Sequence, residues 1–180
     1  MLVSLLAILG TALGAPTRPV DLLHASVAVV SSIDDAQIFG ALSILDAAMI
    51  EVARLGASKG ISKALRDYAT MELNDHLLSQ REGDSLATRL AITPALPPDE
   101  HMANEHIETM ARLNALSGAA FDRAFVEAMV ESHRSGIVTV NATLLPGASH
   151  AELKAFILRL LPTLQQHEQV GREWLDSHTG

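Results

Sequence analysis

Prolines and glycines gather at a few points in this chain and leave four long stretches between them, in which apolar residues recur every three or four positions. This spacing puts the apolar residues on one face of a helix, so each stretch predicts an amphipathic α-helix with one buried side. The breaks fall at residues 56–62, 93–100, 117–118 and 146–149. We therefore expect long helices over about 33–56, from the 56–62 break to 91, over 119–144 and over 150–177.

The length of the middle connection predicts how these helices are arranged. A long helix measures about 40 Å, at about 1.5 Å per residue, and the segment 92–118 is long enough to travel back along it. The two central helices would then run parallel, which is the up-down-down-up topology of ferritin-like bundles. A shorter helix is expected in the crossover, over about 100–113. The predicted fold class is all-α: a ferritin-like four-helix bundle with a long crossover that carries a short extra helix.

Composition agrees with a helical core and excludes some partners. Aromatic residues make up only 3% of the chain and hydrophobic residues 48%, so the core is expected to be aliphatic and closely packed. The formal net charge of -8 argues against binding nucleic acid, which requires a basic surface. We expect a monomer or dimer without a transmembrane span in the mature chain, and an envelope protein as a candidate partner.

The N-terminal residues predict export. An apolar run from Leu2 to Leu13 is followed by small residues and Pro16, a pattern typical of a secretory signal peptide, although no basic residue follows Met1. A membrane anchor is the alternative, but the run is shorter than the roughly 20 residues of a span. The expected organisation is a signal peptide at 1–15, a flexible lead-in at 16–32 and the bundle at 33–177, in the periplasm or at the outer membrane of a bacterium.

Local signals predict how several helices begin and end. Asp34 or Ser32 can cap the first long helix. Gly56 and Gly60 suit left-handed backbone at the connection to the second helix. Ser149 and Glu152 have the spacing of a capping box at the start of the last helix.

One candidate metal ligand falls on the apolar stripe of each long helix: Glu51, His76, His133 and His167. Imidazole and carboxylate groups are the usual means by which a helical bundle holds a transition metal, here iron, copper or zinc. Cysteine is absent from the chain, so no thiolate can contribute. An alternative interpretation makes the histidines core residues whose ring nitrogens are satisfied by neighbouring acceptors.

Position along the helices suggests two layers rather than one group. Counted from the first turn, Glu51 is expected near the level of His167, and His76 near the level of His133. Asp46, Glu72 and Glu127 are candidates for additional ligands. The Glu-x-x-His motif of di-iron bundles is absent from the sequence, which argues against a ferroxidase. A redox enzyme would need an open coordination position and a path for substrate, and ordinary helix packing leaves neither.

Several blocks of this sequence resemble one bacterial family. They are Asn-Asp-His at 74–76, Ser-Gly-x-x-Phe-Asp-Arg at 117–123, and Leu-Pro at 161–162 followed by His167. Over about 33–175 the chain is similar to the exported domain of unknown function 4142, which is also labelled predicted outer membrane protein. The resemblance implies a ferritin-like bundle of unsettled activity, with the four candidate ligands at positions of matching residue type. The chain departs from the family pattern at Phe125, where a tyrosine is usual, and in the extra residues His101 and His106.

Overall fold

The structure is a computed structural model that describes residues 33–97 and 101–178. The expected signal peptide at 1–15 and lead-in at 16–32 lie outside the described residues. Within the described ranges the secondary structure is helical and no strand occurs, which confirms the all-α prediction. None of these helices combines the length and apolar character needed to cross a bilayer.

Five long helices account for most of the described chain. They are α1 (Asp35–Lys59), α2 (Lys63–Arg89), α3 (His101–Ala115), α4 (Gly118–Thr139) and α6 (Ala151–Ser177). Between α4 and α6 the chain forms a π-helical segment, η1 (Val140–Leu144), and the short α5 (Leu145–Gly147). The first, second, crossover and last helices lie within a few residues of their predicted ranges. The third predicted helix, 119–144, corresponds to α4 followed by η1, so it ends in π-helical geometry.

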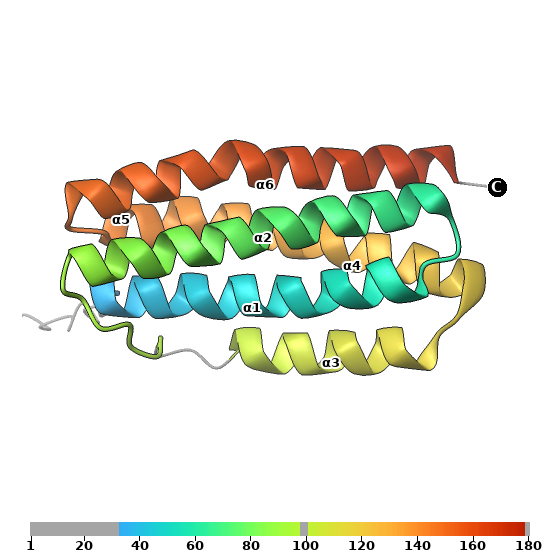
Figure 1. The fold of residues 1–180 in the computed structure, drawn as a ribbon, viewed down its shortest axis with the longest axis horizontal. Coiled ribbons are helices and arrows are strands. Elements are labelled where there is room, and N and C mark those ends of the chain that lie inside the picture. The colour runs from blue at the N-terminus through green and yellow to red at the C-terminus, as the bar shows by residue number, and fades with distance from the viewer. Residues whose placement is uncertain (1–32, 98–100, 179–180) are drawn as a thin grey trace, which may run out of the picture. The chain divides into compact units, whose positions relative to one another are not determined.

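The helices pack as two hairpins. Helix α1 packs along α2, and α4 packs along α6. Figure 1 shows that α2 and α4 run in the same direction, with α1 and α6 running the opposite way. Helix α3 lies beside α1 on the side away from α2 (Figure 1), so α1 has helical neighbours on two sides.

Two apolar clusters form the core, and a polar layer lies between them along the helices. One cluster contains Phe156, Ile157 and Leu144 and joins the start of α1 to the end of α2. The other contains Phe121, Phe125 and Leu65 and joins the end of α1 to the start of α2. On α2, α4 and α6 the buried histidines come between the residues of these two clusters.

The helix connections differ from their sequence predictions, except at Asp34. This residue caps α1 in a capping box with Gln37. Helix α1 continues through Gly56, and Gly60 has a φ of -59°, so neither glycine is left-handed. The α1–α2 connection is held instead by Asp122 of α4, whose carboxylate accepts hydrogen bonds from the backbone N–H groups of Ile61 (3.1 Å) and Ser62 (3.3 Å).

The predicted Ser149–Glu152 capping box is also wrong. His150 is the N-cap residue of α6, and its side chain does not cap the helix. The carboxylate of Asp35, from the start of α1, accepts hydrogen bonds from the backbone N–H groups of Ser149 (2.7 Å) and His150 (3.1 Å). Asp35, from another helix, thus binds the backbone at the start of α6, where a local capping box was expected.

Candidate metal centre

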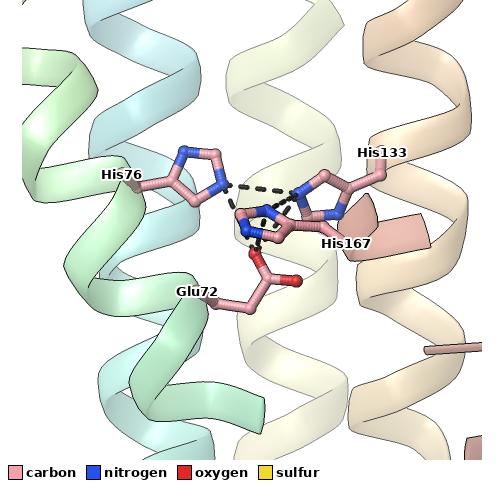
Figure 2. Close-up of side chains that lie close together, drawn as sticks. All are labelled: Glu72, His76, His133 and His167. Atoms are coloured by element: carbon pink, nitrogen blue, oxygen red, sulfur yellow. Dashed lines mark hydrogen bonds and ion pairs between the residues drawn. The ribbon is translucent and has the colours of Figure 1, made fainter. Parts of the chain in front are cut away.

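Four buried side chains meet between the helices. Glu72 and His76 come from α2, His133 from α4 and His167 from α6. One ligand atom of each residue lies within 4.8 Å of the others. Figure 2 shows the three imidazoles and the carboxylate converging on one point. The spacing of Glu72 and His76, four residues apart, places both on the same face of α2.

The donor atoms are spaced as the corners of a small coordination polyhedron. Nε2 of His133 lies 3.4 Å from Nε2 of His76 and 3.2 Å from Nδ1 of His167. Oε2 of Glu72 lies 2.9 Å from the His167 nitrogen, 3.3 Å from that of His133 and 3.5 Å from that of His76. A tetrahedral zinc ion with bonds of about 2.0–2.1 Å has ligand atoms about 3.3 Å apart. Five of the six distances between these donor atoms are therefore close to those of a metal site, and all four atoms lie within 4.8 Å of one another.

An acceptor outside the group holds the other ring nitrogen of each histidine. Nδ1 of His76 lies 2.8 Å from Asp46 of α1, and Nδ1 of His133 lies 2.8 Å from the backbone carbonyl of Met129. Nε2 of His167 lies 2.9 Å from Asp75. A ring N–H that donates to such an acceptor leaves the lone pair of the opposite nitrogen directed at the centre. This is how metal-binding histidines are usually oriented.

The ionisation of Glu72 and that of the histidines depend strongly on one another. Burial acts to raise the pKa of Glu72, but the imidazoles of His133, His167 and His76 outweigh it and hold the pKa well below its ordinary value. Burial acts to lower the pKa of His76, yet Asp46 and Glu72 raise it to about 9. For His167 burial again acts to lower the pKa, and Glu72 followed by Asp75 raises it. Three carboxylates around three imidazoles thus favour positive charge at this place.

Glu72 lacks the hydrogen bonds that a buried carboxylate normally has. Its side chain is 0% exposed, and among the described residues neither of its oxygens accepts a hydrogen bond of ordinary geometry. Leaving a buried carboxylate unsatisfied costs several kcal/mol unless a positive charge offsets it. Tyr68 lies nearby and donates from its hydroxyl to the backbone carbonyl of His167 (3.1 Å). Burial, followed by the charge of Glu72, raises the pKa of Tyr68 well above its usual range, so it remains a neutral phenol.

A cavity of about 400 Å³ adjoins the group. Side chains from α1, α2, α3, α4 and α6 line it, and the three histidines are among them. Aliphatic residues make up much of the remaining lining. Ordinary helix packing was expected to leave no space beside the site, and this cavity departs from that expectation.

The structure brings together three of the four predicted ligands. His76, His133 and His167 meet in one group, so the predicted division into two layers is wrong. Glu51 is not in the group: its side chain is 59% exposed, and Oε2 lies 2.8 Å from Nε2 of His106 on α3. Glu72 takes the place of the carboxylate. The four-residue spacing between Glu72 and His76 is the sequence signal that points to Glu72 as a ligand. From the sequence alone, Glu72 is only one of three candidates for additional ligands.

The other two additional candidates have different partners. Asp46 accepts hydrogen bonds from the His76 ring and from the hydroxyl of Ser79 (2.8 Å), so it orients a ligand and does not join the group. Glu127 accepts a hydrogen bond from Arg123, 2.9 Å away, on the exposed side of α4.

These observations define an all-helical domain with a buried group of one glutamate and three histidines that could hold a metal. The chain belongs to the DUF4142 family, a domain of unknown function, whose model matches residues 22–173. Its structure is similar to the crystal structure of a DUF305 fragment from Deinococcus radiodurans, with a TM-score of 0.70 and 14% sequence identity. The similarity covers 79% of this chain and 95% of that one, and at this identity it shows the fold alone. No match was found among curated proteins.

Proposed function

We propose that this protein binds one transition-metal ion through Glu72, His76, His133 and His167. The observation that carries the proposal is the arrangement of the donors. Four donor atoms from three helices converge at metal-site spacing, and the outward nitrogen of each imidazole is held by an acceptor. A divalent cation would offset the buried charge of Glu72 and of the nearby Asp46 and Asp75.

The donor set narrows the choice of metal. Three imidazole nitrogens and one carboxylate oxygen suit zinc, iron or copper(II), whereas a site for copper(I) would contain thiolate or thioether sulfur. Five of the six donor distances lie near the 3.3 Å of a tetrahedral ion, which favours zinc. The group contains a single carboxylate, and a di-iron centre of the bundle type uses four. We therefore propose a mononuclear site.

The arrangement of the helices supports a ferritin-like bundle as the frame of this site. The directions of α1, α2, α4 and α6 in Figure 1 follow the up-down-down-up order, with α3 in the crossover. Ferritin-like proteins also place their ligands on the inner faces of facing helices. We therefore propose a ferritin-like bundle that holds its metal with fewer ligands than the di-iron centre of such bundles uses.

The test is metal uptake by the full chain, purified without a histidine tag, beside two matched variants. Glu72→Gln removes the buried carboxylate, and Glu51→Gln makes the same chemical change at the exposed glutamate outside the group. We expect near-stoichiometric metal by elemental analysis in the unchanged protein and in Glu51→Gln. In Glu72→Gln we expect affinity for zinc to fall at least tenfold, with helicity retained by circular dichroism.

Melting curves give a second readout in the same experiment. A metal present at a hundred times its dissociation constant stabilises the folded state by about 2.7 kcal/mol. For a chain of this size that raises the melting temperature by about 5–10 °C. The rise should occur in the unchanged protein and in Glu51→Gln and be lost in Glu72→Gln. Equal uptake by all three proteins, or none by any, would contradict the proposal.

A structural role is the second candidate function, and one observation favours it. Every histidine of the group already has an acceptor at one ring nitrogen, as a satisfied core residue would. In this alternative the protein is a non-catalytic module that interacts with a partner in the cell envelope. It predicts that no metal is taken up and that Glu72→Gln changes only the stability.

Export to the bacterial envelope completes the proposal. Its support is the apolar run and the small residues before Pro16 in the sequence. Expression in a bacterium with cell fractionation and N-terminal sequencing tests it. A product in the periplasmic or outer-membrane fraction that begins near residue 16 is expected, and a cytoplasmic product that retains Met1 would refute export.

A further inference from the structure

We infer that the cavity beside the group binds a small, mainly apolar organic molecule, which coordinates the metal through one oxygen or nitrogen donor group. The inference rests on the proposed metal site and assigns it a ligand class. Small-molecule sites are concave and mostly apolar with a few convergent polar groups, and their volumes begin at about 300 Å³. The cavity, at about 400 Å³, falls within this range.

The cavity meets the group on its histidine side. His76, His133 and His167 all line it, whereas Glu72 does not. A metal held by these four residues would thus have the carboxylate on one side and the cavity on the other. Four protein ligands already fill a tetrahedral zinc ion, so a molecule in the cavity would add a fifth donor, an expansion that zinc sites can undergo.

The walls indicate what kind of molecule fits. Aliphatic side chains from α1 and α6 form much of the lining: Leu42, Leu45, Met49, Val52, Leu160 and Leu164. The exposed residues Glu82 and Arg159 also belong to the lining, and their exposure places them toward solvent. Polar side chains also line the cavity, among them Ser79, Thr139 and Thr163, but apolar atoms form most of its wall surface. The lining therefore fits a molecule with an apolar body.

Gly136 provides additional space next to the histidines. It lines the cavity one turn beyond His133 on α4, and a Cβ atom added there would meet nothing within 4 Å. Val140 also lines the cavity and begins the π-helical segment η1. Single π-helical turns inside α-helices are frequent at functional sites. Gly136 is consequently a position in the lining at which a Cβ atom can be added without displacing a neighbour.

The test uses the full chain loaded with cobalt(II), whose visible spectrum reports a change in coordination. Acetohydroxamate and octanohydroxamate are the probes, because they share a metal-coordinating head and differ in apolar length. We expect both to change the spectrum, with octanohydroxamate binding at least tenfold more tightly. Gly136→Phe should weaken octanohydroxamate at least tenfold and acetohydroxamate much less, while Gly136→Ala should leave both unchanged. Gly136→Leu is a smaller filling variant in case the phenylalanine perturbs folding.

Cobalt content and helicity, measured on every variant, separate the outcomes. Protein that binds cobalt but shows no spectral change with either probe would overturn the inference and leave the metal site standing. Equal affinity for the two probes, or no effect of either filling variant, would show that the apolar walls play no part and would likewise overturn it. Protein that takes up no cobalt and no zinc would refute the proposed function and the inference with it.

Discussion

At the scale of single residues, Asp35 shows how one carboxylate can join two helix starts. It lies in the first turn of α1 and accepts hydrogen bonds from the backbone N–H groups and side chains of Ser149 and His150, just before α6. Burial acts to raise the pKa of Asp35, but the hydrogen bonds from His150 and Ser149 outweigh it and lower the pKa from 3.8 to about 2. The ionised form is therefore the one that the fold stabilises.

This lowered pKa predicts a pH-dependent contribution to stability. A carboxyl group whose pKa is lower in the folded state than in the unfolded state stabilises the fold at pH values above its unfolded-state pKa. This stabilisation is lost as the pH falls through the folded-state pKa. The Asp35 contribution should be complete above about pH 5, decline from about pH 4 and largely vanish near pH 2. Asp35→Asn is expected to lower the free energy of unfolding by about 2 kcal/mol at pH 7 and by little near pH 2.

Denaturant unfolding of the protein and of Asp35→Asn between pH 2.5 and 7 measures this difference. Asp67→Asn is the matched control, because Asp67 is 63% exposed and its carboxylate pairs with Lys63 on the surface. It should change stability by less than about 0.5 kcal/mol at neutral pH. A difference for Asp35→Asn that stayed constant with pH would show that the charge of Asp35 is not what matters.

At the scale of elements, Gly40 determines how the crossover leaves α2. The backbone N–H of Ala95 donates to the carbonyl of Ala36 (2.9 Å), which holds the start of the crossover against α1. A Cβ atom at Gly40 would overlap the carbonyl oxygen of Ala95, far inside van der Waals contact. Only glycine allows the two backbones to approach this closely.

Gly40→Ala is therefore expected to destabilise the protein although alanine favours helices. Alanine in place of glycine gains about 1 kcal/mol within a helix. Overpacking against a backbone carbonyl costs about 1–3 kcal/mol, so we expect a net loss of up to about 2 kcal/mol. Gly83→Ala in α2 is the matched control. Its Cβ would make ordinary 3.6 Å contacts with Phe156, so the same change should stabilise by about 0.5–1 kcal/mol. Thermal unfolding compares the two, and a stabilised Gly40→Ala would disprove the close approach.

The helices were more predictable than their connections. Apolar periodicity extends over many residues and locates each helix to within a few positions. A connection depends on single contacts: Asp122 of α4 holds the α1–α2 connection and Asp35 of α1 holds the start of α6. These partners lie 61 and 114 positions away in the sequence, where no local pattern indicates them.

At the scale of the whole bundle, the polar group links the two hairpins. Glu72 and His76 belong to the α1–α2 hairpin, and His133 and His167 belong to the α4–α6 hairpin. Apolar clusters lie on both sides of the group along the helices, and they limit its contact with solvent except through the cavity. A bound metal would thus add a link between the two hairpins, which also meet through apolar packing and through the hydrogen bonds of Asp35 and Asp122.

The sequence by itself determined the all-helical class, the extents of the main helices and the three histidines on inward faces. Helical periodicity suffices for these, because it states which face of a helix is apolar. Only the tertiary structure decided that Glu72 and not Glu51 completes the group, and that the four donors lie in one layer. Helix α1 packs against α2 on one side and α3 on another, so its apolar positions do not single out one inward face. Packing between segments that are distant in the sequence fixes the rotation and offset of each helix. The rotation and offset in turn decide which residues form the ligand set and which line the cavity.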